Sequence, residues 1–150
     1  MATVIACYDA KPAVRTATDG LPATASERAD RRPGPTATGR HLDASIEHGI
    51  TVMTHRLFDH AQRRDPHHRR RWIALADGNN HQIERIKAEA CDRDINVTIL
   101  IDFIHVLQYL WDAAADLHPT QPGRAAFVEH TARNLLDHNP AQVISQLTNA

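Results

Sequence analysis

The chain has 150 residues, 42% of them hydrophobic and 5% aromatic, which is enough aliphatic material for a core and far from a low-complexity composition. Lys and Arg number 17 against 18 Asp and Glu, so the net charge of −1 does not identify a nucleic-acid-binding protein, although a local basic patch can still bind phosphate. The two cysteines form no CxxC pattern, no apolar run approaches the roughly 20 residues of a membrane span, and the start lacks a signal-peptide pattern, so we expect a cytoplasmic protein.

The first predicted element is a strand over residues 3–8 (TVIACY), which is short, apolar and rich in β-branched residues. From residue 10 to residue 42 the composition shifts to Thr, Ala, Arg, Pro and Gly, which predicts a long flexible loop. Such a loop is unusual inside a compact domain, so it is either functional or held by something else.

A helix is predicted next, with Asp43 as its N-cap. Its inward face consists of apolar residues at helical spacing: Ile46, Ile50, Met53, Leu57 and Ala61. The helix ends before Pro66, within the strongly basic segment RRDPHHRRR at residues 63–71.

Two strands with a helix between them follow. Residues 72–76 (WIALA) and 96–101 (NVTILI) are continuous apolar runs, typical of strands that are buried on both faces. Asn79 or Asn80 can cap the intervening helix, which runs to about Arg93. The order strand, helix, strand predicts a parallel pair joined by a right-handed crossover.

The remaining residues predict helices only. One follows Asp102, another spans about residues 124–138, and Pro140 opens a short third one. The inward face of the first is expected to hold Ile104, Leu107, Trp111 and Ala114. The chain is therefore predicted to be an α/β piece, with its core over residues 43–115, followed by an all-α tail over residues 116–150.

The residues most able to carry chemistry end the two predicted parallel strands. Asp77 and Asp102 follow them directly, and His105 comes three positions later. Ligands of parallel sheets lie beyond the carboxyl ends of the strands, so neighbouring strands would place both carboxylates where Mg²⁺ or Mn²⁺ can bind. Such ions activate a nucleophile and stabilise the leaving oxygen in phosphodiester transfer. Structural roles remain open. An Asp-Gly pair such as Asp77-Gly78 is common in turns, Asp102 can cap a helix, and His105 can be a core histidine.

The basic segment is a second candidate site. Arg63, Arg64, Arg69, Arg70 and Arg71 can contact phosphates, or they can form an ordinary solvated loop. The sequence has no glycine-rich nucleotide loop, no GxSxG and no HExxH pattern, so nucleotide-dependent enzymes and the common hydrolases receive no support.

Three blocks of the sequence also carry a family resemblance: MATVIACYDAKPAVRT from residue 1, RRDPHHRRRWIALADGNNHQIERI from residue 63, and VTILIDFIHVLQYLWDAA from residue 97. In this order they resemble bacterial insertion-sequence transposases of the ISKra group, which are distant relatives of the Mutator-like transposases. The resemblance implies an RNase H-like fold and a DDE active site that cuts and joins DNA with two divalent metal ions.

The resemblance also implies roles for individual residues. Asp77 matches the second catalytic aspartate, while Asp102 and His105 match a D-x-x-H element of supporting residues. The helices after His105 match the start of an α-helical insertion. The first acidic residue of the family is expected upstream of Met1 and the third beyond Ala150, so the chain is expected to be an internal piece of a transposase.

Three functions are therefore carried forward. The first is a transposase fragment that is inactive alone, because one carboxylate cannot position two Mg²⁺ ions and none is expected to bind stably. The second is a Mg²⁺- or Mn²⁺-dependent nuclease that assembles carboxylates by self-association. The third is a non-enzymatic fragment that binds DNA, or a full-length transposase, and is nucleoid-associated in its bacterium when bound to DNA.

Overall fold

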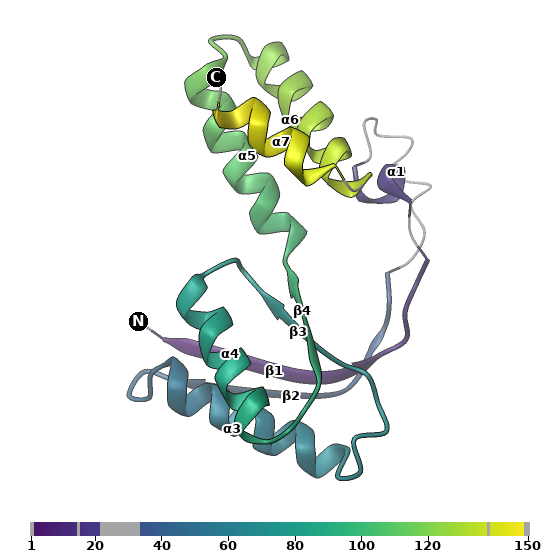
Figure 1. Ribbon diagram of the computed structural model, residues 1–150, viewed down its shortest axis with the longest axis vertical. Coiled ribbons are helices and arrows are strands. Elements are labelled where there is room, and N and C mark those ends of the chain that lie inside the picture. Colours follow the sequence, from purple (N-terminus) through teal and green to yellow (C-terminus); the bar gives the residue numbers. More distant parts are fainter. Residues whose placement is uncertain (1, 15, 22–33, 138, 149–150) are drawn as a thin grey trace. The chain divides into compact units, whose positions relative to one another are not determined.

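The computed structural model describes residues 2–14, 16–21, 34–137 and 139–148 (Figure 1). It is a mixed α/β structure with the elements β1 (Thr3–Ala10), α1 (Ala17–Gly20), β2 (Ala37–Ser45), α3 (Ile50–Arg64), β3 (Trp72–Ala76), α4 (Asn80–Asp92), β4 (Val97–Ile101), α5 (Phe103–Leu117), α6 (Gln121–Leu136) and α7 (Pro140–Thr148). Contacts between residues divide the chain into two units, one comprising residues 1–11 and 36–102 and the other residues 12–35 and 103–150. Each unit is described by itself.

The first unit begins with an antiparallel hairpin of β1 and β2, whose register runs from Thr3 opposite Ser45 to Ala10 opposite Ala37. The predicted first strand is confirmed and extends to residue 10. The predicted flexible loop is wrong for residues 37–42, which belong to β2; its residues 22–33 lie outside the described residues. Composition could not reveal this strand, because its hydrogen bonds come from a partner more than 25 residues away in the chain.

The predicted start of the first long helix is also wrong. Asp43 lies in β2 rather than at a helix N-cap, and Ile46, expected on the inward face, is 85% exposed. The helix, α3, begins at Ile50 after Gly49, which provides no side-chain cap. From there on the predicted face is close to the observed one, since Met53 is fully buried and Phe58 is the other large buried residue.

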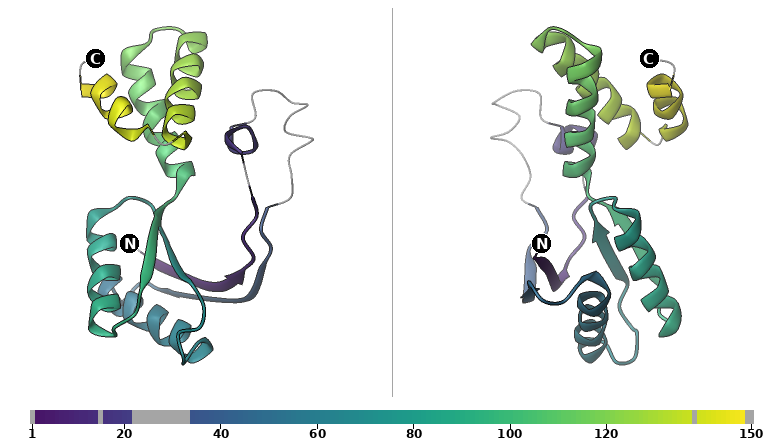
Figure 2. Two further views of the ribbon diagram at one scale, coloured as in Figure 1. Left: turned by 45° about the vertical axis from the view of Figure 1, so that its right-hand side comes forward. Right: turned by 90° about the vertical axis from the view of Figure 1, so that its left-hand side faces the viewer.

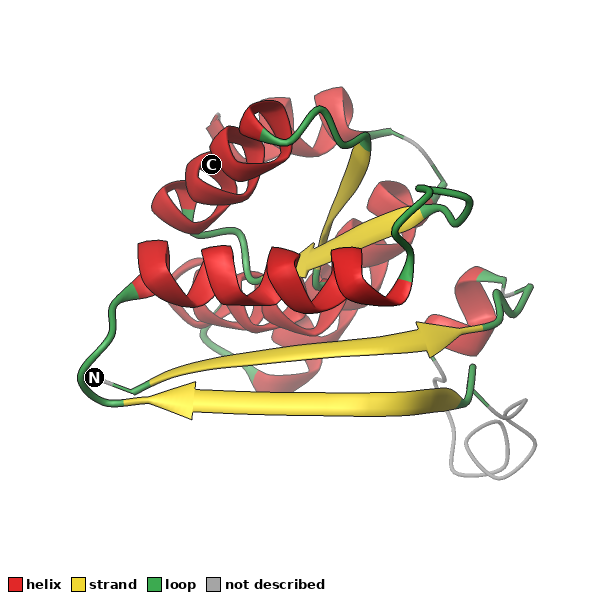
Figure 3. Ribbon diagram, turned by 90° about the horizontal axis from the view of Figure 1, so that it is seen from below, coloured by secondary structure: helices red, strands yellow, loops and turns green. Residues whose placement is uncertain are grey.

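The predicted parallel pair is confirmed. β3 and β4 lie side by side with Trp72 opposite Val97 and Ala76 opposite Ile101. Asn79 caps α4, because its side-chain oxygen accepts a hydrogen bond from the backbone N–H of Gln82. The core between these strands and helices α3 and α4 consists of Phe58, Ile86, Ala90 and Ile95, with Trp72, Ala74, Val97 and Ile99 packed against it. In the view of Figure 3, α3 runs alongside the hairpin.

Burial of this parallel pair on both faces was a wrong prediction. Ile73 and Leu75 of β3 are 52% and 58% exposed, and Leu100 and Ile101 of β4 are 47% and 45% exposed. Within the described residues, helices cover one face of the pair and the opposite face presents apolar side chains to solvent.

The second unit is built on the helices α5, α6 and α7 (Figure 2). Its core cluster is formed by Leu110, Ala114, Val128 and Ala132. The predicted inward face of α5 is partly wrong, because Ile104 is 61% and Trp111 40% exposed, whereas Leu107 and Ala114 do pack inward. The polar residues of α5, among them Gln108, Asp112 and Asp116, occupy one stripe and leave a broad apolar arc. Spacing alone does not identify the part of that arc that meets a neighbour. No helix among the described residues is long and apolar enough to cross a membrane.

Arg93, directly after α4, joins that helix to α3. Its guanidinium lies 2.8 Å from a carboxylate oxygen of Asp59 and 2.6 Å from one of Glu89, and it donates to Gln62 at 3.1 Å. The same group lies 5.8 Å from the centre of the Phe58 ring. Because the arginine side chain is only 14% exposed, its charge is shielded from solvent and compensated mainly by these two carboxylates.

Replacing Arg93 by alanine is expected to lower the free energy of unfolding by about 2 kcal/mol, since two carboxylates and an amide lose their charged donor. Urea denaturation followed by tryptophan fluorescence measures the loss. Arg56→Ala is the control, because Arg56 forms an exposed pair with Asp43 at 3.6 Å and exposed pairs contribute about 0.5 kcal/mol. Equal losses in the two variants would show that the Arg93 network does not stabilise the helix pair.

Candidate functional site

The two aspartates identified in the sequence lie at the same edge of the parallel sheet. Ala76 and Ile101 are paired in register, and Asp77 and Asp102 are the next residues of each chain segment. The backbone N–H of Asp102 donates to the carbonyl oxygen of Ala76 at 2.7 Å, so the pairing of the two segments continues past the strand ends. Both aspartates are half-buried.

Asp77 has a structural role in the turn that leads into α4. Its Oδ1 accepts a hydrogen bond from the backbone N–H of Asn79 at 2.9 Å, and its own N–H donates to the side chain of Gln82 at 3.3 Å. Gly78 adopts a φ of +96°, a conformation that strongly favours glycine. Oδ2 of Asp77 contacts no polar partner within the described residues, so one oxygen is available for a ligand.

The two residues of the predicted D-x-x-H element belong to different units. Asp102 ends the first unit and His105 lies in the first turn of α5, in the second unit. Both are half-buried, and both interact with other residues. Their placement is compatible with the supporting role that the resemblance implies, and also with ordinary structural roles.

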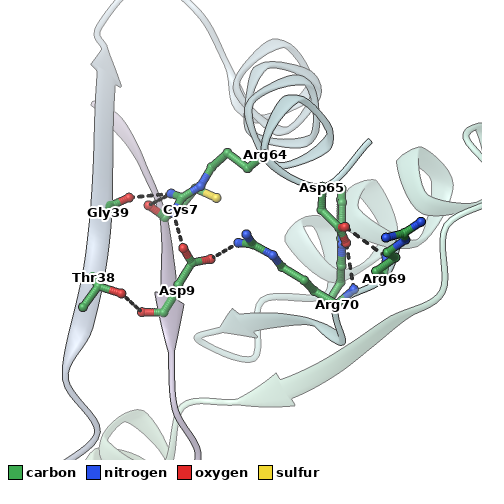
Figure 4. A network of polar contacts seen from close by, with 9 residues as sticks. Cys7, Asp9, Thr38, Gly39, Arg64, Asp65, Arg69 and Arg70 are labelled. Atoms are coloured by element: carbon green, nitrogen blue, oxygen red, sulfur yellow. Dashed lines mark hydrogen bonds and ion pairs between the residues drawn. The ribbon is translucent and has the colours of Figure 1, made fainter. Parts of the chain in front are cut away.

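The basic segment divides into two groups of arginines (Figure 4). Arg64 and Arg70 point toward Asp9 of β1, and each places a guanidinium nitrogen 2.6 Å from one of its carboxylate oxygens. Arg64 also donates to the carbonyl oxygens of Cys7 and Gly39. Arg64, the last residue of α3, and Arg70, in the segment before β3, therefore hold the hairpin to these two parts of the chain.

Arg63, Arg69 and Arg71 form the second group. Their side chains are exposed, and none has an acidic partner in the part of the chain that the structure describes. Of the five arginines predicted to contact DNA, these three are the ones that form no ion pair within the described residues.

Asp65, which the sequence did not single out, organises this segment. Its carboxylate accepts hydrogen bonds from the backbone N–H groups of Arg69 and Arg70 and from the indole N–H of Trp72, each at 2.9 Å. The residue is 6% exposed, and the indole hydrogen bond, helped by the two backbone donors, lowers the pKa of Asp65 to about 2. The position directly before Pro66 at a helix end was the only sequence signal for such a role.

A cleft of about 1070 Å³ lies in the first unit, between β1, α3 and β3. Arg64, Asp65 and Arg70 line it near the start of β3, and Asp77 with His81 lines it beyond the end of β3. The candidate carboxylate and the arginine network therefore border one continuous space. Within the described residues, no group of three or more His, Cys, Asp or Glu side chains is placed to hold a metal ion.

Comparison of the chain with protein-family models, with curated proteins and with solved structures gave no match.

The low pKa of Asp65 predicts a specific acid sensitivity. A carboxyl group with a pKa of about 2 in the folded chain and about 3.9 in the unfolded chain stabilises the fold at neutral pH. That contribution is complete above about pH 4 and is lost as the pH falls toward 2.

Asp65→Asn should therefore lower the urea midpoint at pH 7, and the gap to the wild type should shrink between about pH 4 and pH 2. Asp112→Asn, at an exposed position of α5, is the control and should leave the midpoint nearly unchanged at each pH. A gap for Asp65→Asn that stays constant down to pH 2 would contradict the proposed network.

Proposed function

We propose that this chain is part of a metal-dependent enzyme that cleaves and transfers DNA strands, as in DDE transposases, and that Asp77 is one of its metal-binding carboxylates. The proposal includes the RNase H-like fold and the supporting roles of Asp102 and His105 that the sequence resemblance implies. By itself the chain is proposed to be inactive.

One observation carries this proposal. Asp77 and Asp102 directly follow two hydrogen-bonded parallel strands that are in register, at the edge of the sheet where α/β proteins bind their ligands. A metal ion at this edge prefers oxygen ligands, as Mg²⁺ and Mn²⁺ do. Turn formation uses only one oxygen of Asp77, which is compatible with a second bond to a metal.

These ligands fit a divalent metal only in part. Two carboxylates at one sheet edge do not complete the ligand set of two Mg²⁺ ions, which need several converging oxygens. Asp77 would hold the metal, with Asp102 beside it in a supporting role; when bound, the metal would activate the attacking oxygen and stabilise the leaving one. The chemical step itself is assigned to the complete site and not to this chain alone.

Mn²⁺ provides a direct test that does not require activity. In a backbone amide NMR spectrum, millimolar Mn²⁺ should broaden the signals of residues 77–79 and 102 first, because the paramagnetic ion would lie nearest to them. Asp77→Asn should abolish that selectivity, whereas Asp94→Asn, at an exposed turn after α4, should preserve it. Broadening elsewhere, or equally in Asp77→Asn, would refute the metal-binding role of this residue.

Plasmid nicking distinguishes the proposal from a self-sufficient nuclease. The wild-type chain with Mn²⁺ is expected to leave supercoiled plasmid intact. Nicking that disappears in Asp77→Ala would instead establish a nuclease that assembles its site without a further polypeptide.

DNA binding without catalysis is a second candidate function, favoured by the exposed guanidinium groups of Arg63, Arg69 and Arg71. Cations that have no internal partner can displace the counterions of a phosphate backbone, which makes binding dependent on salt. Arg64 and Arg70 are assigned a structural role instead, because both form ion pairs with Asp9.

Replacing Arg63, Arg69 and Arg71 together by alanine should weaken binding to duplex DNA at least about tenfold at low salt and reduce the salt slope by roughly 2 to 3. Fluorescence anisotropy with a labelled duplex measures both quantities. A triple variant of the exposed residues Lys11, Arg40 and Lys87 removes the same charge and is the control. If both triple variants lose equal affinity, net charge and not the basic segment governs binding.

A further inference from the structure

The cleft in the first unit follows the unpaired edges of two strands. Every residue from Ala2 to Ala10 lines it, and so does every residue from Arg70 to Leu75. Successive side chains of a strand point to opposite faces, so a space that touches every consecutive residue must run along the edge of the strand. β2, which pairs with the other edge of β1, contributes no lining residue.

Both edges carry backbone groups with unused hydrogen-bonding capacity. Within the described residues, β1 pairs only with β2, and β3 pairs only with β4. A strand edge of this kind is a template for another strand. α3 forms the floor between the edges, since Thr54, Leu57 and Phe58 line the cleft. Phe58 also belongs to the core cluster against which Trp72 and Ala74 of β3 pack. We call this space, bounded by β1, α3 and β3, the strand slot.

We infer that the two edges run in opposite directions, because they border the same cleft and the end of one lies near the start of the other. Asp9, near the end of β1, forms an ion pair with Arg70, which lies just before the start of β3. One inserted strand can therefore pair with both edges, antiparallel to β1 and parallel to β3. We choose this orientation because β1 is the longer edge, with eight residues against five, and antiparallel pairing is slightly more stable per residue.

The surroundings define the side chains of the occupant. The floor is largely apolar, and on the opposite face Val4, Tyr8, Ile73 and Leu75 are 47–66% exposed, so the strand needs apolar residues on both faces. Where the strand begins, three arginines and two aspartates line the slot: Arg64, Arg70, Arg71, Asp9 and Asp65. This excess of positive charge favours an acidic residue at the N-terminal end of the strand.

We propose that the strand slot binds an apolar β-strand of a partner polypeptide, with an acidic N-terminal end, so that β1–β2 and β3–β4 become one five-stranded sheet. This is recognition by β-strand addition, in which the main chain provides affinity and the side chains provide selectivity. The proposal does not depend on metal binding at Asp77.

The test uses the full chain and the synthetic peptide Ac-EVIVIVTKK-amide, whose last two lysines keep it soluble. Saturable binding by calorimetry is expected, together with slower amide hydrogen exchange in both β1 and β3. The matched peptide Ac-EVPVPVTKK-amide should bind at least about tenfold more weakly, since proline removes two backbone donors.

Leu57→Asp, which places a charge on the floor of the slot, should also weaken binding at least about tenfold. Val52→Asp, at a 43% exposed position of the same helix that does not line the slot, should bind as the wild type does. The proline peptide keeps the test valid if Leu57→Asp does not fold. The proposal would be overturned if the peptide did not bind, or if it protected only one of the two strands. It would also be overturned if the chain sedimented as a dimer with both edges already protected, because a second copy would then fill the slot.

Discussion

The carboxylate of Asp65 is the constraint on which the first unit depends. A buried charge is costly unless its oxygens are satisfied, and here two backbone N–H groups and the indole of Trp72 satisfy them. Together these bonds fix the path of the chain from the end of α3 into β3. They also hold the Trp72 ring near Phe58, with the ring centres 6.0 Å apart, so the turn and the core are set by the same residue.

The same turn gives the arginines of the basic segment two different roles: some form ion pairs within the protein, and others are exposed. With its backbone held by Asp65, Arg70 reaches Asp9 from one side while Arg64 reaches it from α3. The carboxylate of Asp9 is thereby shared by two cations, and the hairpin is held to the loop before β3. The basic segment therefore combines two arginines that pair with Asp9 and three exposed arginines that form no ion pair within the described residues.

Local signals in the sequence predicted much of this structure. A β-branched apolar run predicted β1, continuous apolar runs predicted β3 and β4, Asn79 was one of two predicted caps of α4, and the strand–helix–strand order predicted the parallel pair. Features that depend on distant partners were not predictable: β2 exists because β1 pairs with it, and the roles of Asp9 and Asp65 follow from side chains that meet only after folding. The placement of Asp77 at the sheet edge follows from the strand pattern in the sequence, whereas its metal-binding role is a proposal.

The uncovered apolar surface connects the two proposals. Ile73 and Leu75 have the pattern of a strand buried on both faces, yet one face is open to solvent, and contiguous exposed apolar surface commonly marks a binding site. A strand in the slot, parallel to β3, would end at the same sheet edge as Asp77 and Asp102. Any oxygen-bearing residue at its C-terminal end would then lie beside these carboxylates, and the site would gain the additional ligand that a divalent metal requires. Strand addition and metal binding would then be coupled events, because each would stabilise the arrangement that the other needs.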